Sequence, residues 1–353
     1  MKRVIWLLGV VVALASCNKK EAAEPYVPHI NPVEGLFILN EGTFTYANAS
    51  LSYYDIGGDS VSNHLFFKVN NAPIGDVGQS LAKVGDDLYI VVNNSKYIYK
   101  VDAATILYKA KIDGFTSPRN MLAVSDDKAY VTDLTSPGFW SLNLNTLEKR
   151  FVETGSATEA MVKVGGEVFM SNWSNYYIAG ASNNTLQVID CESDELVGTI
   201  EVAQEPNAMV VDKNNHVWVS CSGGYEAPQD PAIICIDAAN HQIVKRFDLS
   251  EGSYPNGLAI DGAGETLYFM NGGMSALNVY KMSVDDAQLP ETPFITADGR
   301  LFYGMRVNPD NGEIYITDAK NYVQNGDLLR YSAAGTLIST HELGLIPSFM
   351  LFN

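Results

Sequence analysis

The chain has 353 residues, of which 46% are hydrophobic, and its 41 acidic residues outnumber its 23 lysines and arginines, giving a formal net charge of −18. The hydrophobic fraction is ample for a large core. A surface this negative repels nucleic acid, heparin and anionic lipid headgroups, which excludes nucleic-acid binding and favours neutral or cationic partners.

The N-terminus has the pattern of a cleaved export signal. Lys2 and Arg3 form a basic start, an apolar run covers residues 4–13, and the sequence LASC ends at Cys17. The apolar run is too short to span a membrane. LASC resembles a bacterial lipobox, which implies that residues 1–16 are a signal peptide and that Cys17 becomes the lipidated N-terminus. Residues 17–33 are charged and proline-rich, which predicts a flexible tether.

From residue 34 onward one pattern recurs: a short apolar strand, a tight Gly/Asp/Asn turn and a second strand around an aromatic residue. The first strand of each repeat, strand A, carries an apolar anchor, and successive anchors are 40 to 49 residues apart: Leu81, Met121, Met161, Met209, Leu258, Met305 and Met350. The second, strand B, carries an aromatic anchor: Phe37, Tyr89, Tyr130, Phe169, Trp218, Tyr268 and Tyr315. This period predicts four-stranded blades arranged radially, because one blade cannot bury both of its faces alone.

The repeat is incomplete at both ends. The first copy begins at strand B with GLFILNEG (residues 35–42), and the chain ends on an unmatched strand A within residues 347–353. We therefore predict an all-β, seven-bladed β-propeller spanning residues 34–353, in which the C-terminal strand completes the first blade and closes the ring. Closure removes the open sheet edge that would otherwise invite aggregation.

Loop lengths give the predicted ring two different faces. The A–B turns are minimal, as at residues 85–87 and 262–264, whereas the B–C connections are long, as at residues 40–50 and 172–184. In a propeller these two kinds of connection lie on opposite faces. Long loops on a rigid scaffold are where binding residues usually lie, so the long-loop face is the predicted site.

Aromatic and amide residues are concentrated on the long-loop face. Tyr and Trp give a large contact area at low entropic cost, and amides supply neutral donors and acceptors. The predicted ligand-binding residues are Phe44, Tyr46, Asn94, Lys96, Arg119, Asn120, Trp140, Trp173, Tyr176, Tyr177, Asn207, Tyr225, Asn256, Tyr303 and Tyr322. This chemistry suits a large ligand with an apolar body and amide or hydroxyl edges. The few cations nearby, which are Lys96, Arg119, Arg306 and Lys320, argue against a phosphate or carboxylate ligand.

The histidines are expected away from this face. His29 lies in the tether, His64 and His341 are expected on outer D strands, and His216 and His241 beside short turns of the opposite face. No nucleophile–base pair or histidine-containing metal cluster is therefore expected at the site, which predicts a protein that is not an enzyme and needs no cofactor.

Acidic and cysteine residues outside this set have their own interpretations. A calcium site made only of carboxylates, from Glu226 and Asp230, is an alternative to a metal-free face. Cys191, Cys221 and Cys235 are interpreted as structural thiols, and simple hairpin register places the last two about two residues out of step for a disulfide.

The lipobox, the tether, the NEGTF start and the seven YVTD- or VFMSN-type repeats together resemble the YncE-like propeller lipoproteins of Bacteroidetes. Within that group the chain is similar to the BtuG type. The resemblance implies an outer-membrane lipoprotein that faces the cell exterior, captures cobalamin or another corrinoid and passes it to a TonB-dependent outer-membrane transporter. A glycan- or protein-binding surface propeller is the alternative function.

A second resemblance suggests an enzyme. PNGLAIDGAGETLYFMN (residues 255–271) resembles gluconolactonase- and regucalcin-type propellers, which implies that Asn256 is a metal ligand. Tyr303, however, stands where that family has its aspartate, and the closing PSFM segment lacks its glutamate. A metal-dependent lactonase is therefore the more distant alternative.

Overall fold

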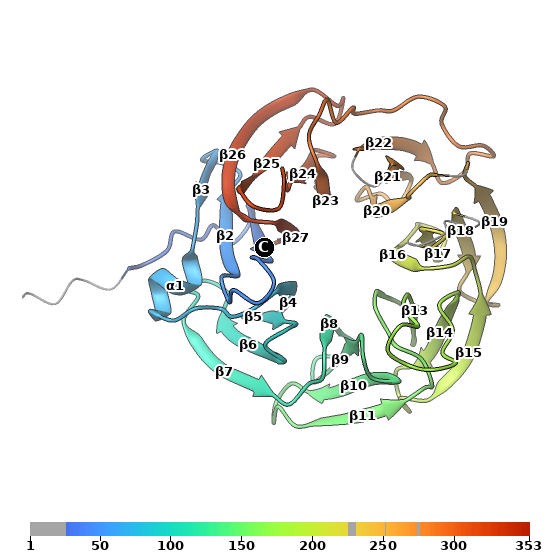
Figure 1. The fold of residues 1–353 in the computed structure, drawn as a ribbon, viewed down its shortest axis with the longest axis horizontal. Helices are drawn as coiled ribbons and strands as arrows, with labels where there is room; N and C mark the ends of the chain where they lie inside the picture. The colour runs from blue at the N-terminus through green and yellow to red at the C-terminus, as the bar shows by residue number, and fades with distance from the viewer. Residues whose placement is uncertain (1–25, 225–230, 251, 274–275) are drawn as a thin grey trace, which may run out of the picture.

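The computed structural model describes residues 26–224, 231–250, 252–273 and 276–353. These residues form seven antiparallel sheets, arranged radially as the blades of a ring (Figure 1). The predicted all-β, seven-bladed β-propeller is confirmed. The predicted signal peptide, with Cys17, lies outside the described residues, as do Tyr225, Glu226 and Asp230.

The blades are numbered in ring order, and each is given from its inner strand A to its outer strand D. Blade 1 consists of β27 (Pro347–Phe352), β1 (Gly35–Asn40), β2 (Ser50–Asp55) and β3 (Ser60–Ser62). Blade 2 consists of β4 (Gly78–Val84), β5 (Asp87–Val92), β6 (Tyr97–Asp102) and β7 (Tyr108–Asp113). Blade 3 consists of β8 (Pro118–Ala123), β9 (Lys128–Asp133), β10 (Gly138–Asn143) and β11 (Lys149–Glu153).

The remaining four blades follow the same order. Blade 4 consists of β12 (Met161–Val164), β13 (Glu167–Asn172), β14 (Thr185–Asp190) and β15 (Leu196–Glu201). Blade 5 consists of β16 (Pro206–Val211), β17 (His216–Cys221), β18 (Ala232–Asp237) and β19 (Gln242–Asp248). Blade 6 consists of β20 (Asn256–Ile260), β21 (Thr266–Gly273) and β22 (Ala276–Ser283). Blade 7 consists of β23 (Phe302–Val307), β24 (Ile314–Asp318), β25 (Asn325–Tyr331) and β26 (Leu337–Leu345).

The two ends of the propeller meet in blade 1. The C-terminal strand β27 is the inner strand of that blade and pairs antiparallel with β1, with Met350 opposite Ile38 (Figure 1). This confirms the predicted ring closure, in which a strand from the end of the chain supplies the hydrogen bonds that β1 would otherwise leave open.

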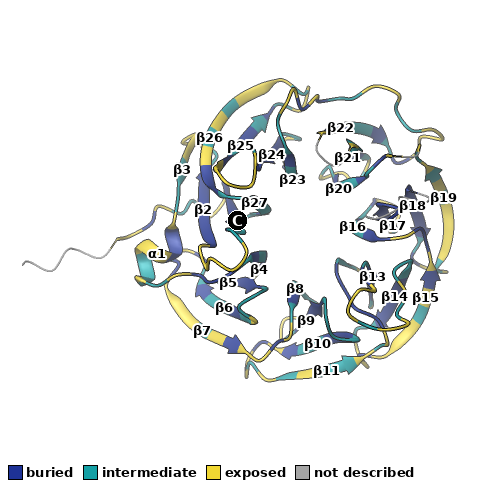
Figure 2. Ribbon diagram, in the orientation of Figure 1, coloured by how far each residue is buried: buried dark blue, intermediate teal, exposed yellow. Residues whose placement is uncertain are grey.

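The core lies between neighbouring blades. The seven aromatic anchors of the B strands are 0–2% exposed, because each is covered by side chains of the adjoining blade. The outer D strands consist mostly of exposed and intermediate residues, so Figure 2 shows them largely in yellow and teal at the rim, around dark inner strands. Each blade is therefore buried at its centre and exposed to solvent along its outer edge.

Blade 6 differs from the predicted four-stranded pattern. It has three strands, and beyond them Ile295 forms a single bridge to Val279 of β22. Pro290 and Pro293 precede this bridge and lack the N–H groups that an outer strand needs, which explains why no fourth strand forms there.

A short helix also interrupts the pattern. The connection from blade 1 to blade 2 contains α1 (Leu65–Asn70), whose Leu65 and Phe66 are buried against β2. His64 is the N-cap residue of α1, so its predicted place on an outer strand is wrong. Among the described residues no helix is both long and apolar enough to cross a membrane.

The three described cysteines are free thiols. In blade 5 Cys221 pairs across the ladder with Ala232, whereas Cys235 lies opposite Trp218. The two cysteines are therefore out of step, by three residues rather than the predicted two or so, and this explains why their sulfur atoms do not form a disulfide.

Candidate functional site

A ring of polar side chains surrounds the mouth of the central channel on the long-loop face. Strand register makes the A-strand anchors equivalent. Six of the seven lie opposite the residue that follows the aromatic anchor of their own blade, as in the pairs Leu81–Ile90 and Met305–Ile316, and Leu258 lies at a register shift in β20. Two positions before each anchor stands a polar residue, and these seven are here called the mouth ring: Gln79, Arg119, Glu159, Asn207, Asn256, Tyr303 and Ser348.

The first six residues of the mouth ring line a pocket of about 830 Å³. Its walls come from the long loops and the starts of the inner strands, and the other lining residues are Trp173, Tyr254, Leu277, Gly299, Arg300, Leu301, Phe302, Lys320 and Tyr322. Beneath it the inner strands enclose a channel of about 620 Å³, and the two share Gln79, Glu159 and Asn207. The site is therefore an aromatic-walled pocket above a continuous channel.

Arg119 connects three blades within the mouth ring. Its Nε donates to Glu159 Oε2 at 2.7 Å and its Nη1 donates to Gln79 Oε1 at 2.6 Å. The Arg119 and Glu159 side chains are only 18% and 12% exposed. Burial acts to lower the pKa of Arg119, but the Glu159 carboxylate more than offsets this and raises it. The positive charge of Arg119 therefore lies against a carboxylate and is balanced inside the pocket.

Tyr303 of the mouth ring and Glu41, which lies beside it, form a second polar group. Burial, followed by the nearby Glu41 charge, raises the pKa of Tyr303 well above its usual value. Burial also raises the pKa of Glu41, against the opposing effects of Ser348 and Arg119. The Tyr303 ring meets Tyr322 edge-on, with ring centres 5.8 Å apart. Tyr303 is therefore a neutral phenol that is held in place by an aromatic neighbour.

The two asparagines of the ring differ in how they are held. Asn207 accepts a hydrogen bond from the Ser220 hydroxyl at 2.6 Å and donates to the carbonyl oxygen of Pro255 at 3.3 Å. Asn256 accepts one from the N–H of Gly257, while its Nδ2 has no hydrogen-bond partner among the described residues. Asn256 therefore offers a pocket ligand an unused donor.

Residues 34–353 match the family described as Domain of unknown function (DUF5074). The chain belongs to this family. The matched residues include every described strand, so the DUF5074 domain here is the whole propeller. Comparison with curated proteins gives no match.

Solved structures share the fold of this DUF5074 propeller at low identity. A quinonprotein alcohol dehydrogenase-like protein from Bacteroides thetaiotaomicron has a TM-score of 0.70 at 17% identity, covering 90% of this chain and 78% of that one. A functionally unknown protein from Desulfotomaculum acetoxidans has a TM-score of 0.68 at 11% identity, covering 90% and 98%. A putative 6-phosphogluconolactonase from Bacteroides fragilis has a TM-score of 0.65 at 12% identity, covering 91% and 98%. These likenesses show the fold alone.

The pocket of the DUF5074 propeller brings together part of the predicted set. The predicted residues that line it are Arg119, Trp173, Asn207, Asn256, Tyr303 and Tyr322. Asn120 directly follows Arg119 in β8 and lines the channel beneath the pocket. Its side-chain amide donates to the carbonyl oxygen of Glu159 at 3.1 Å. The long-loop aromatics Phe44, Tyr46, Tyr176 and Tyr177 are 59–72% exposed and do not line the pocket.

Three other predicted residues fall elsewhere. Trp140 is wrong as a loop-face residue, because it lies within β10, packs against Phe151 with ring centres 5.0 Å apart and donates to Asp133 at 3.2 Å. Asn94 anchors its own turn by donating to Asp76, and Lys96 is exposed beside it; neither lines the pocket.

Several pocket residues were missed by sequence reasoning. Gln79 and Glu159 are mouth-ring positions, and counting two residues back from every anchor would have found both. Tyr254 and Arg300 belong to D–A connections, from which the prediction named no site residue, and Phe302 begins the inner strand β23. Arg300 adds a pocket cation that makes no ion pair with any described residue, whereas Lys320 pairs with Asp327 at 2.9 Å.

Proposed function

We propose that this protein binds a bulky, largely neutral ligand in the mouth pocket, and that the ligand is a corrinoid. The observation that carries the proposal is the mouth ring, in which seven equivalent positions from seven blades are all polar while the pocket above them has aromatic walls. A ligand with an apolar body and amide edges satisfies both parts of such a site.

The size and charge of the pocket support this proposal. A volume of about 830 Å³ lies in the range of pockets for sizeable organic ligands. The Arg119–Glu159 pair neutralises itself, and Gln79, Asn207 and Asn256 offer amides of the kind that recognise amide groups on a ligand. Trp173 and Tyr322 supply flat apolar area from opposite loops.

The proposal extends to how the protein works in the cell. We propose that it is anchored at the outer membrane through Cys17, faces the cell exterior and delivers the ligand to a TonB-dependent outer-membrane transporter. The exposed aromatics Phe44, Tyr46, Tyr176 and Tyr177 stand on the same face as the pocket and suit contact with such a partner. In this role the protein binds and releases its ligand without chemical change.

The lactonase alternative gains little from the geometry. Asn256, the residue that resembles a metal ligand of that family, is in the mouth ring. The positions that correspond to the other two ligands belong to Tyr303 and Ser348, which bind divalent metals poorly. We therefore favour binding over catalysis at this pocket.

Calorimetric titration of the full chain with cyanocobalamin tests the proposal. Binding is expected in the wild type, and Tyr322→Ala is expected to weaken it about tenfold, the loss typical of an aromatic contact residue. Tyr108→Ala is the matched control, since Tyr108 also meets another tyrosine edge-on, with ring centres 6.0 Å apart, but lies on the outer strand β7.

Absence of heat with cyanocobalamin would reject the corrinoid. If the wild type then bound a glycan and Tyr322→Ala did not, the pocket would be identified as a glycan-binding site. Hydrolysis of a lactone that depends on added Ca²⁺ or Zn²⁺ would establish the enzyme alternative instead.

A further inference from the structure

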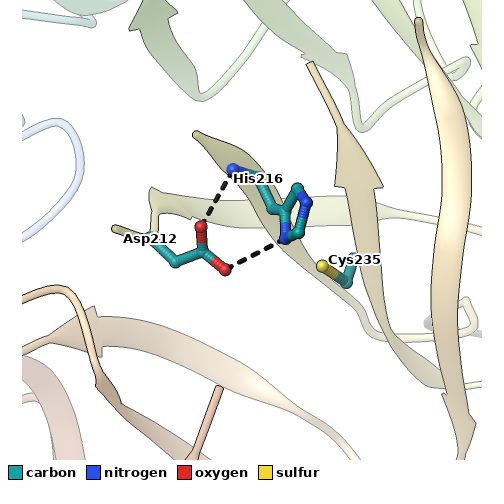
Figure 3. A group of neighbouring side chains, drawn as sticks. All are labelled: Asp212, His216 and Cys235. Atoms are coloured by element: carbon teal, nitrogen blue, oxygen red, sulfur yellow. Dashed lines mark hydrogen bonds and ion pairs between the residues drawn. The ribbon is translucent and has the colours of Figure 1, made fainter. Parts of the chain in front are cut away.

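A group of three potential metal ligands lies in blade 5 on the short-turn face, opposite the mouth pocket. Asp212 directly follows β16, His216 begins β17, and Cys235 lies in the adjacent strand β18. Figure 3 shows the carboxylate, the imidazole and the thiol turned toward one another. One ligand atom from each residue can be chosen so that all three lie within 4.8 Å of one another.

Asp212 is held rigidly by the turn that it begins. Its Oδ1 accepts the backbone N–H groups of Asn214 at 2.8 Å and His216 at 2.9 Å. Its Oδ2 accepts the indole N–H of Trp218 at 3.0 Å and lies 3.3 Å from Nδ1 of His216. A carboxylate fixed in this way by surrounding donors is already oriented, which is the arrangement that supports metal ligands in proteins.

The hydrogen bonds of the A–B turn are enough to explain why an aspartate stands at position 212. Asp261 occupies the corresponding position in blade 6 and accepts the backbone N–H groups of Glu265 at 2.8 Å and Thr266 at 3.1 Å. A carboxylate here is therefore a normal way to cap the A–B turn. His216 and Cys235 need a different explanation.

Comparison with blades 2 and 7 shows what is unusual about these two residues. The residue two before the B-strand aromatic anchor, and the residue opposite that anchor on strand C, form an ion pair in both blades. These pairs are Asp87–Lys100 at 2.8 Å and Glu313–Arg330 at 2.9 Å. In blade 5 the same two positions carry His216 and Cys235. Where blades 2 and 7 have an acid and a base, blade 5 therefore has an imidazole and a thiol, two side chains that bind metals, beside the fixed carboxylate of Asp212.

We propose that Asp212, His216 and Cys235 bind a divalent cation of zinc-like character. The ligands would be a carboxylate oxygen, the Nδ1 atom and the thiolate sulfur, the donor types that Zn²⁺ prefers. Atoms bound to one tetrahedral zinc lie about 3.5 Å apart, so side-chain rotations suffice to draw the three together. The side chain of His216 is 28% exposed, which leaves a path for the ion and a place for water as the fourth ligand.

Binding requires Cys235 to exchange a proton for the metal. Burial raises the pKa of its thiol to about 12, so the free group is protonated, and the S–H bond is replaced by a sulfur–metal bond as the proton passes to solvent. The nearby Lys245 ammonium donates to the carbonyl oxygens of Val284 at 2.7 Å and Asp286 at 3.0 Å. These hydrogen bonds hold that positive charge to blade 6.

Titration of the full chain with Co²⁺, a spectroscopic substitute for Zn²⁺, tests the site. Thiolate ligation is expected to produce a near-ultraviolet charge-transfer band that Zn²⁺ abolishes by competition. Cys235→Ser and His216→Ala are expected to lose the band. Cys221→Ser is the matched control for a buried free thiol. His241→Ala is the control for a histidine paired with an acid, since His241 lies 2.9 Å from Glu167 and forms no metal-ligand group with a thiol among the described residues. Both controls should keep the band.

A thermal melt guards against loss of the fold in the variants. Zn²⁺ is expected to raise the Tm of the wild type and of His241→Ala but not that of His216→Ala, whose substituted side chain is partly exposed. No band in the wild type, or a band that persists in Cys235→Ser, would overturn the proposal. Because the site is on the face opposite the pocket, cyanocobalamin binding should be the same with and without Zn²⁺.

Discussion

Arg119 and Glu159 face each other across the boundary between blades 3 and 4, with 2.7 Å between Nε and Oε2. Neither residue is near the other in sequence, and each comes from the same position of its own repeat. Their contact closes part of the mouth ring and removes two charges from the pocket. It therefore affects both the stability of the ring and the chemistry of the site.

Removing one charge of the Arg119–Glu159 pair should destabilise the folded protein. We expect Glu159→Gln to lower the free energy of unfolding by about 2 kcal/mol, because the mostly buried Arg119 loses its counter-charge. Urea unfolding measures the change. Glu265→Gln is the control, since its pair with Lys213 at 3.2 Å is 37% and 57% exposed and should change stability by less than about 0.5 kcal/mol. Equal losses in both variants would contradict the interpretation.

Glu41 should make stability depend on pH. Because burial raises its folded-state pKa above the usual 4.5, the folded protein holds a proton that the unfolded chain releases. The difference in bound protons therefore lowers the free energy of unfolding as pH rises from about 4.5, until Glu41 is ionised in the folded protein as well. Glu41→Gln should raise the Tm at neutral pH and lose that advantage below about pH 4.5. Melting curves between pH 4 and 8 test this, with the exposed Glu148→Gln as control; a pH-independent difference would count against it.

Ring closure should depend on β27. Deleting residues 347–353 exposes the edge of β1 and is expected to abolish cooperative unfolding. A milder variant, Met350→Ala, removes a side chain that is 1% exposed and should cost about 3 kcal/mol in urea unfolding. Leu337→Ala on the outer strand β26, where the residue is 40% exposed, is the control and should cost much less. A truncated protein as stable as the full chain would refute closure by this strand.

Arg300 should distinguish ligands that carry an anionic group. It lines the pocket without an ion pair to any described residue, so a ligand phosphodiester would supply its missing partner. We expect Arg300→Gln to weaken cyanocobalamin binding about tenfold, since cyanocobalamin has such a group in its nucleotide loop. A corrinoid that lacks this loop should bind both proteins equally in calorimetry.

The control for this prediction is Arg246→Gln, on the outer strand β19, where the arginine pairs with Asp248 at 2.7 Å. It should not affect either ligand. If Arg300→Gln weakened the binding of both corrinoids to the same extent, Arg300 would contribute to the shape of the pocket and would not recognise the phosphodiester.

Single residues show how far sequence position alone locates a side chain in the ring. Asn256 and Tyr303 line the pocket because they lie at or near the start of inner strands, at the mouth of the channel. Trp140 was wrong because loop and strand cannot be separated in DLTSPGFW by pattern, and the indole turned out to belong to a strand that packs on Phe151. Glu159 was missed because the count of two residues back from each anchor was not made. Its contact with Arg119, 40 residues away, could not be predicted in that way, because only adjacent blades bring the two side chains together.

The sequence by itself determined the propeller, the number of blades and the closing strand. The reason is that every blade must bury the same anchors against its neighbours, so packing repeats in the sequence as a period. Only the tertiary structure decided which side chains of the mouth ring contact one another, as Arg119 and Glu159 do, and that His216 lies beside Cys235. The first contact joins two blades and depends on the closed ring. The second depends on the side-chain positions that the pairing of β17 with β18 produces.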